Sequence, residues 1–142
     1  MRVSEIMTRA PVTISPATRV DEVAHIMRDK GISSVILVTN GKLVGIVTER
    51  DLVHRVIAAG KDPKRLMAAD VSTKPVVAVR EHCEVEDAVE RMHENKIRRI
   101  VVVDDMDHAV GIVTTDDVGY NLKSMSEELA AKYLSLTKRN LH

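Results

Sequence analysis

Two short runs of this 142-residue sequence carry the same polar side chains at the same spacing. Thr48 is followed three residues later by Asp51, and Thr114 by Asp117, each time after a Gly-Ile-Val run. A hydroxyl and a carboxylate at this spacing form a capping box, which satisfies free backbone N–H groups at the start of a helix. The spacing alone therefore favours two helix starts.

The other reactive side chains do not form a catalytic or metal-binding pattern. The six histidines are scattered, none lies in a nucleophile motif, and no glycine-rich phosphate loop is present. His82 with Cys83, and the acidic residues between Asp104 and Asp107, lack further ligands at usable spacing. The sequence therefore predicts no enzyme, no catalytic residue, no metal site and no required cofactor.

The two polar runs belong to an internal repeat. The copies match at a spacing of 65 residues, and of 66 after one residue inserted in the second copy. The matched positions include Thr8 and Thr73, Met27 and Met92, Gly45 and Gly111, and Asp51 and Asp117.

Each copy predicts the same order of elements. Apolar residues recur at helical spacing from Val20 to Met27 and from Val85 to Met92. Short strands are expected at residues 12–14, 35–38, 43–47, 76–79, 100–103 and 110–113, with turns at 40–41 and 104–107. Second helices are expected to begin near Asp51 and Asp117.

Local residues predict three further helix starts. Thr18 and Asp21 have capping-box spacing before the first helix, and Cys83 occupies the matching position in the second copy, which favours a structural role for this thiol. Ser124 and Glu127 predict another capping box. The helix after it carries an apolar stripe that packs either on its own chain or on a second subunit. The stripe consists of Leu129, Tyr133 and Leu136.

These elements predict an α+β fold of two β-α-β-β-α repeats. Each repeat is too small to bury much surface alone, so we expect them to pack sheet to sheet about a pseudo-two-fold axis. The expected divisions are residues 1–60, residues 61–123 and a C-terminal helical tail at residues 124–142, with Gly60 to Pro63 marking the joint.

With these motifs the chain resembles a stand-alone tandem pair of CBS (cystathionine beta-synthase) domains. The resemblance rests on the two Gly-Ile-Val-Thr-x-x-Asp runs, each after a hairpin, and on the strand from Arg98 to Asp104. It covers about Val3 to Leu122. It implies a regulatory module in which each aspartate faces a cleft and accepts hydrogen bonds from the hydroxyls of a ribose, as a carboxylate can.

The resemblance also implies that each cleft combines both copies. The residues implied for the first cleft are Thr48, Arg50, Asp51, Lys74, Val76, Val77, Ala78, Ile97, Arg98 and Arg99. Those implied for the second are Ala10, Val12, Thr13, Ile14, Ile32, Ser33, Ser34, Thr114, Asp116 and Asp117. Apolar members would enclose the adenine ring.

The two implied clefts differ in charge. Arg50 and Lys74 make the first basic, with Arg98 expected to point inward, and arginine can hold phosphate oxygens through two parallel N–H bonds. In the second cleft Asp116 replaces Arg50, and serines replace the arginine pair. We therefore expect tighter nucleotide binding at the Asp51 cleft and weaker binding at Asp117.

The function predicted is non-catalytic binding of an adenine nucleotide, first AMP and then ADP or ATP, that relays energy or metabolite state to an unknown regulated protein. The alternatives are a ligand-independent dimeric scaffold and a sensor of an S-adenosylmethionine-type ligand. The resemblance also implies a disk-like homodimer.

Composition limits the other partners. Lys plus Arg and Asp plus Glu are both 21, so no overall charge attracts nucleic acid or an anionic membrane. The first residues lack the apolar core of a signal peptide, and no run approaches the length of a membrane span. A cytoplasmic protein is expected.

Overall fold

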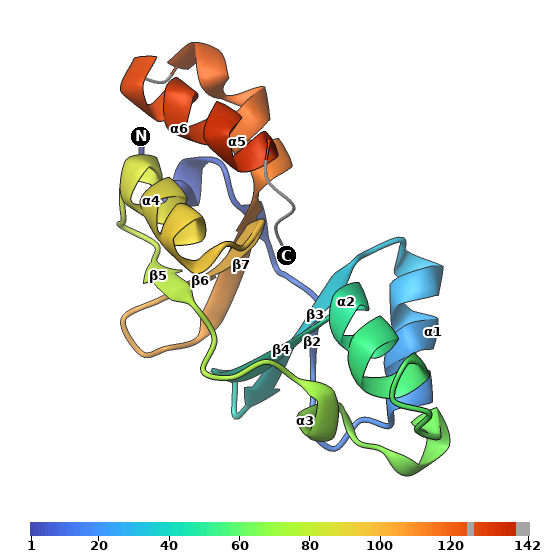
Figure 1. The fold of residues 1–142 in the computed structure, drawn as a ribbon. Helices are drawn as coiled ribbons and strands as arrows, with labels where there is room; N and C mark the ends of the chain where they lie inside the picture. The colour runs from blue at the N-terminus through green and yellow to red at the C-terminus, as the bar shows by residue number, and fades with distance from the viewer. Residues whose placement is uncertain (125–126, 139–142) are drawn as a thin grey trace. The chain divides into compact units, whose positions relative to one another are not determined.

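A computed structural model describes residues 1–124 and 127–138. The chain forms two compact units (Figure 1). One, called here the first-repeat unit, is Pro11–Val76. The other, called the second-repeat unit, joins Met1–Ala10 to the chain from Val77 onward.

The first-repeat unit has the predicted β-α-β-β-α order. Strand β2 pairs parallel with β3, and β3 pairs antiparallel with β4. Its elements are β2 (Thr13–Ile14), α1 (Val20–Lys30), β3 (Ser34–Thr39), β4 (Lys42–Thr48), α2 (Glu49–Leu52), a π-helical turn (Val53–Ile57), a 3₁₀ turn (Pro63–Arg65) and α3 (Ala68–Val71).

The second-repeat unit repeats this order and adds elements at both ends. Its sheet has the order β1-β7-β6-β5, with β5 parallel to β6. Its elements are a 3₁₀ turn (Val3–Glu5), β1 (Thr8–Arg9), β5 (Ala78–Arg80), α4 (Val85–Asn95), β6 (Arg99–Val103), β7 (Ala109–Thr114), α5 (Thr115–Tyr120), η4 (Leu122–Ser124) and α6 (Glu127–Thr137). The predicted α+β fold of two repeats with a C-terminal helix is therefore confirmed.

The predicted apolar patterns form the two cores. In α1 the buried positions are Val20, Val23 and Met27, which share one side of the helix and join a cluster with Val35 and Leu37 of β3. In α4, Val85, Ala88, Val89 and Met92 do the same against β6 and β7. The hairpin between β3 and β4 turns through Asn40 and Gly41, both at positive φ, as the Asn-Gly pair predicts.

The first ten residues complete the core of the second repeat, which local sequence patterns do not reveal. Strand β1 pairs antiparallel with β7, so that Arg9 lies opposite Gly111. Val3 donates its backbone N–H to the Cys83 carbonyl at 2.8 Å. Val3 and Met7 are buried in the same cluster as α4. The segment before one repeat therefore stabilises the other.

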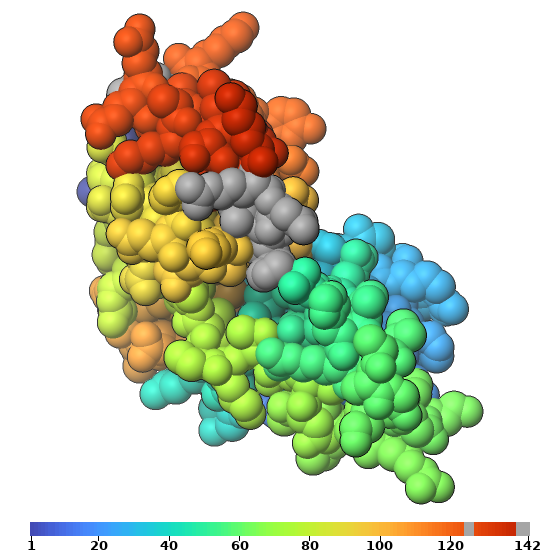
Figure 2. All heavy atoms as spheres, viewed as in Figure 1, coloured from blue at the N-terminus to red at the C-terminus, as the bar shows by residue number. Residues whose placement is uncertain are grey.

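Helix α6 packs within its own chain. Leu129 and Leu136 are buried in the core of the second-repeat unit, and Tyr133 packs against that core. Lys132 of α6 pairs with Glu90 of α4, and this ammonium lowers the pKa of the Glu90 carboxyl. Figure 2 shows the atoms of α6, in red, against those of α4, in yellow. The apolar stripe of the C-terminal helix therefore packs on its own chain, where α4 and α5 cover it.

Two of the expected helix caps are wrong. Helix α1 begins after Arg19, and Thr18 does not cap it; instead its carbonyl accepts the Ala68 N–H at 2.7 Å. Arg19 pairs with Asp21, and its hydrogen bonds lower the pKa of that carboxyl to about 2. Helix α4 begins after Glu84, because the Cys83 carbonyl is occupied by Val3. The box expected from Ser124 to Glu127 spans residues 125–126, which lie outside the described residues.

A matched pair of glycine substitutions tests the role of the N-terminal segment. A Cβ at Gly111 would overlap the Met7 sulfur and lie 2.9 Å from its Cγ and 3.1 Å from the Thr8 carbonyl oxygen. At the equivalent Gly45 the nearest atom is the Ser72 hydroxyl at 3.2 Å. We expect Gly111→Ala to lower the free energy of unfolding by about 1–3 kcal/mol, as overpacking does, and Gly45→Ala by under about 1 kcal/mol. Urea unfolding measures both, and equal losses would contradict the packing of Met7 on β7.

Candidate functional site

The first Thr-x-x-Asp motif forms the capping box predicted from its spacing. Asp51 Oδ2 accepts the Thr48 N–H at 2.9 Å and the Thr48 hydroxyl at 3.2 Å, and Thr48 Oγ1 accepts the Asp51 N–H at 3.3 Å. The box starts α2 directly at the end of β4. It therefore fixes the carboxylate at a strand end and uses one of its two oxygens.

The second oxygen of Asp51 joins the motif to the segment that leads into the next repeat. Asp51 Oδ1 accepts the Thr73 hydroxyl at 3.0 Å. Thr73 is held there because it pairs with Ile46 on β4, with its N–H 2.8 Å from the Ile46 carbonyl. Asp51 is only 7% exposed. A charged group so buried requires such partners.

Arg55 is a further neighbour of this carboxylate. It lies one helical turn after Asp51, with its Nε 3.9 Å from Asp51 Oδ1. The Arg55 Nη1 donates to the carbonyls of Val71 and Ser72 at 3.1 and 2.7 Å. Neither Arg55 nor Thr73 is among the site residues predicted from the sequence. The signal for Arg55 was its i+4 spacing from Asp51, and for Thr73 its match with Thr8 in the repeat.

The second motif has the same cap and a different surrounding. Asp117 Oδ2 accepts the Thr114 N–H at 2.8 Å and its hydroxyl at 3.1 Å. Asn121 occupies the position of Arg55, and its side chain donates to the Asp117 backbone carbonyl at 2.8 Å. Asp117 is half-buried, whereas Asp51 is buried. The two carboxylates therefore share the same capping contacts but differ in burial, in the Thr73 contact and in their basic neighbours.

The residues implied for the first cleft divide between the two units. Thr48, Arg50, Asp51, Lys74 and Val76 belong to the first-repeat unit, where Arg50 and Lys74 are exposed. The members of the second-repeat unit are Val77, Ala78, Ile97, Arg98 and Arg99. Of the arginine pair, Arg98 is exposed and Arg99 is half-buried. The grouping of these two sets, and the inward direction of Arg98, stay predictions.

The residues implied for the second cleft also divide between the two units. Ala10, Thr114, Asp116 and Asp117 lie in the second-repeat unit. Those in the first-repeat unit are Val12, Thr13, Ile14, Ile32, Ser33 and Ser34.

Two backbone hydrogen bonds show which motif lies beside the start of each hairpin. The Arg98 carbonyl accepts the Thr115 N–H at 3.0 Å, and the Ser33 carbonyl accepts the Glu49 N–H at the same distance. The start of each hairpin thus adjoins the motif of its own repeat. The Arg98 backbone therefore lies beside the motif that contains Asp116 and Asp117. The basic residues Arg50, Arg55 and Lys74 belong to the first-repeat unit, as Asp51 does.

The remaining polar clusters have structural explanations. Burial raises the pKa of the Cys83 thiol, which disfavours the reactive thiolate. The Asp104 carboxylate accepts the backbone N–H groups of Met106 and His108, and these bonds lower its pKa and close the β6–β7 turn. Within residues 1–124 and 127–138, no three His, Cys, Asp or Glu side chains are grouped as metal ligands. No helix in that same part of the chain is long and apolar enough to cross a bilayer.

The repeat, the hairpin order and the two capped motifs define a pair of CBS domains. The CBS domain profile matches residues 3–58 and 68–121. The chain therefore belongs to the CBS domain family.

Relatives with similar sequences agree with this assignment. The CBS domain-containing protein YhcV of Bacillus subtilis is 32% identical over 141 residues, which cover 99% of this chain and 98% of YhcV. An uncharacterized protein of Methanopyrus kandleri is 39% identical over 132 residues, 89% of this chain and 67% of that protein. The inosine-5'-monophosphate dehydrogenase of Thermoplasma acidophilum is 34% identical over 117 residues, but the match spans only 23% of that enzyme.

Solved structures with the same fold include ligand complexes. The CBS domain protein TA0289 of Thermoplasma acidophilum, of unknown function, has a TM-score of 0.82 at 29% identity, covering 100% of this chain and 79% of TA0289. The CBS domain pair of MJ0100, in complex with 5'-methylthioadenosine and S-adenosyl-L-methionine, has a TM-score of 0.78 at 28% identity, covering 87% and 97%. CBSX2 in complex with AMP has a TM-score of 0.73 at 26% identity, covering 87% and 96%.

Proposed function

We propose that the protein is a non-catalytic regulatory module that binds an adenine nucleotide, AMP before ADP or ATP, and relays the level of that nucleotide to a partner protein. The observation that carries the proposal is the buried Asp51 carboxylate, fixed at the end of β4 by Thr48 and Thr73. AMP in CBSX2 and adenosyl compounds in MJ0100 support the same ligand class.

In this proposal the aspartates recognise the ribose. Both oxygens of Asp51 already accept hydrogen bonds, but each carboxylate oxygen has two lone pairs and can accept another. A ribose diol would share Oδ1 with Thr73 or displace the Thr73 hydroxyl. Arg50 and Lys74, both exposed in the first-repeat unit, would attract the phosphate, while Asp116 beside the second motif would repel it. The Asp51 site is therefore proposed as the tighter of the two.

Two other functions follow from particular observations. The complex of MJ0100 favours an adenosyl ligand without phosphates, which would suit the Asp117 site because Asp116 is acidic. A ligand-independent scaffold is favoured by the capping boxes, since they give both aspartates a structural role without any ligand. For either function we propose a cytoplasmic homodimer, as the family resemblance implies.

A thermal-shift panel tests the proposal. The intact protein is heated with AMP, 2'-deoxy-AMP, ADP, ATP, 5'-methylthioadenosine and S-adenosylmethionine. AMP at about a hundred times its Kd should add roughly 2.7 kcal/mol to the free energy of unfolding and raise the Tm. The 2'-deoxy analogue should give a smaller rise, because it lacks one of the two hydroxyls bound by aspartate.

The matched variants assign the site. Asp51→Asn should remove most of the AMP effect, and Asp117→Asn should remove less of it. A rise in Tm that depends only on Asp117 would overturn the proposed order of the sites. If no adenosine compound changes the Tm, the nucleotide proposal fails and the scaffold function is favoured.

A further inference from the structure

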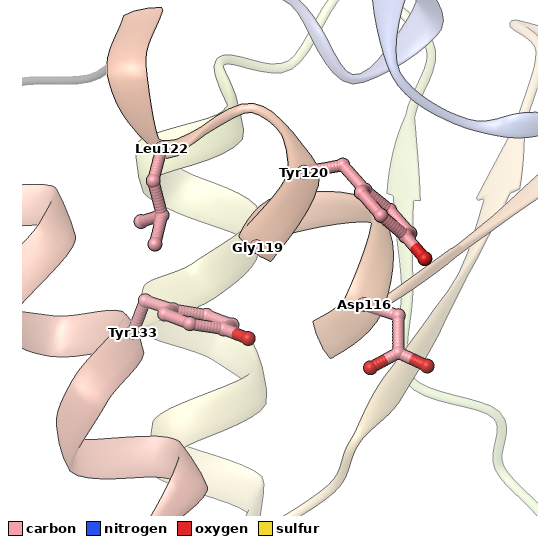
Figure 3. Close-up of a pocket in the computed structure, with 5 residues that line it drawn as sticks. All are labelled: Asp116, Gly119, Tyr120, Leu122 and Tyr133. Atoms are coloured by element: carbon pink, nitrogen blue, oxygen red, sulfur yellow. The ribbon is translucent and has the colours of Figure 1, made fainter.

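A pocket of about 290 Å³ lies between the last helices of the second-repeat unit. Its lining comes from α5, from the η4 turn and from α6. Figure 3 shows the five residues that line it, which are Asp116, Gly119, Tyr120, Leu122 and Tyr133. All belong to one unit, so the pocket is defined by that unit alone.

The aromatic content of the pocket is its most specific feature. The chain contains two tyrosines and no phenylalanine or tryptophan, and both tyrosines line this pocket. Tyr120 is 90% exposed at the end of α5. Leaving an aromatic ring in contact with water is unfavourable, because its apolar surface is not buried. Both tyrosine rings of the chain thus line one pocket, and one of them is left in solvent.

Gly119 explains how Tyr133 reaches the pocket. A Cβ at Gly119 would lie 3.1 Å from Cζ of Tyr133, with its hydroxyl oxygen closer still. Because Gly119 has no side chain, the Tyr133 ring from α6 can lie directly on the backbone of α5. In Figure 3 the hydroxyls of Tyr120 and Tyr133 both point toward the side of the pocket on which Asp116 lies.

Asp116 gives the pocket a negative charge. It lies on α5 one turn before Tyr120, and its side chain is exposed. Within residues 1–124 and 127–138, no ion pair engages Asp116. The Thr114–Asp117 box caps the helix without Asp116. A carboxylate beside two phenol rings therefore repels phosphate and attracts a cation.

We infer that this pocket binds a guanidinium group. The guanidinium plane can stack on a phenol ring while two of its N–H groups donate bidentate hydrogen bonds to a carboxylate. A primary ammonium offers a point charge and no flat face, so it fits the two rings less well. The pocket is of the size of the smaller ligand sites of proteins. The group comes either from a free guanidino compound or from an arginine of a partner protein.

This inference goes beyond the nucleotide proposal and does not rest on it. Tyr120 and Tyr133 are absent from the residues proposed for the nucleotide, and the ligand has the opposite charge. Asp116 belongs to the weaker nucleotide set, so its substitution is read with guanidinium probes and no nucleotide present.

The tyrosines themselves report the binding. Because the chain has only two, their ring signals in a ¹H–¹³C NMR spectrum of the intact protein are readily assigned. Methylguanidinium and the peptide acetyl-Gly-Arg-Gly-amide should shift the signals of both rings. Butylammonium and the neutral citrulline peptide serve as matched controls and should shift them far less. Absence of a shift with both guanidinium probes, or an equal shift with butylammonium, would overturn the inference.

Two substitutions and one comparison complete the test. Asp116→Asn should weaken peptide binding by about tenfold, because a charge-assisted pair is lost. Tyr120→Leu, at a site 90% exposed and hence tolerant of change, should weaken it by about threefold or more. Unchanged affinity in both variants would contradict the site. Tighter binding of the peptide than of methylguanidinium would assign the site to a protein arginine, and the reverse to a free guanidino compound.

Discussion

Replacing Leu136 with alanine is expected to lower the free energy of unfolding by about 2–5 kcal/mol. Leu136 is 1% exposed and belongs to the core of the second-repeat unit together with Met92 and Leu129. The substitution removes buried apolar surface and leaves a cavity between α6 and the helices that it covers. The effect should therefore be among the largest for any single residue of the C-terminal helix.

Leu134 provides the control on the same helix. It is 52% exposed, so Leu134→Ala changes the same side chain in the same way without opening a cavity. Its effect should stay within about 0.5 kcal/mol. Urea unfolding followed by circular dichroism measures both variants. Equal, small losses would mean that α6 does not pack on α4 in solution, and a Leu136→Ala loss that depends on protein concentration would place α6 on a second subunit.

The elements of both repeats could be predicted because their signals are local. A helix such as α1 shows its buried face as apolar residues at helical spacing, and the run of Val35 to Leu37 is buried throughout, as a covered strand is. The Asn40–Gly41 turn has only a few compatible conformations. These features depend on neighbouring residues alone, so one sequence suffices to recognise them.

Contacts between distant segments escaped prediction. The pairing of β1 with β7 joins residues about a hundred positions apart, and nothing in the Thr8–Arg9 dipeptide indicates its partner. The false cap at Thr18 has the same origin, because the Ala68 N–H occupies the Thr18 carbonyl and α1 starts one residue later. Local spacing predicts a possible cap, but hydrogen bonds to distant residues determine where the helix begins.

The candidate site was predicted only in part for the same reason. Capping-box spacing identified Thr48 and Asp51, and the structure forms that box. Thr73 reaches Asp51 from a segment 22 residues later, through a single bridge to Ile46. Arg98 could be selected by the family resemblance, but its hydrogen bond to Thr115 depends on the hairpin register.

Replacing the two aspartates should also lower the free energy of unfolding by different amounts when no ligand is present. Asp51→Ala is expected to lower the free energy of unfolding by about 2–4 kcal/mol, because it removes both a helix cap and the charged hydrogen bond that Asp51 accepts from Thr73. Asp117→Ala should cost about 0.5–2 kcal/mol, the usual loss for a cap, because Asp117 is less buried and its bonds stay within its own box. Urea unfolding of the two variants, each compared with wild type, measures the difference. Equal losses would contradict a structural role for the Thr73 contact.

Asp51→Asn separates this structural role from ligand binding. An amide oxygen can still accept from the Thr48 N–H or the Thr73 hydroxyl, so the variant should keep more of its stability than Asp51→Ala. It loses the charge that strengthens hydrogen bonds to a ribose, and its NH₂ group cannot accept one. The expected result is a folded protein whose Tm rises far less with AMP than that of wild type. A Tm rise as large as that of wild type would show that Asp51 only caps α2, and the nucleotide would then have to be recognised elsewhere in the chain.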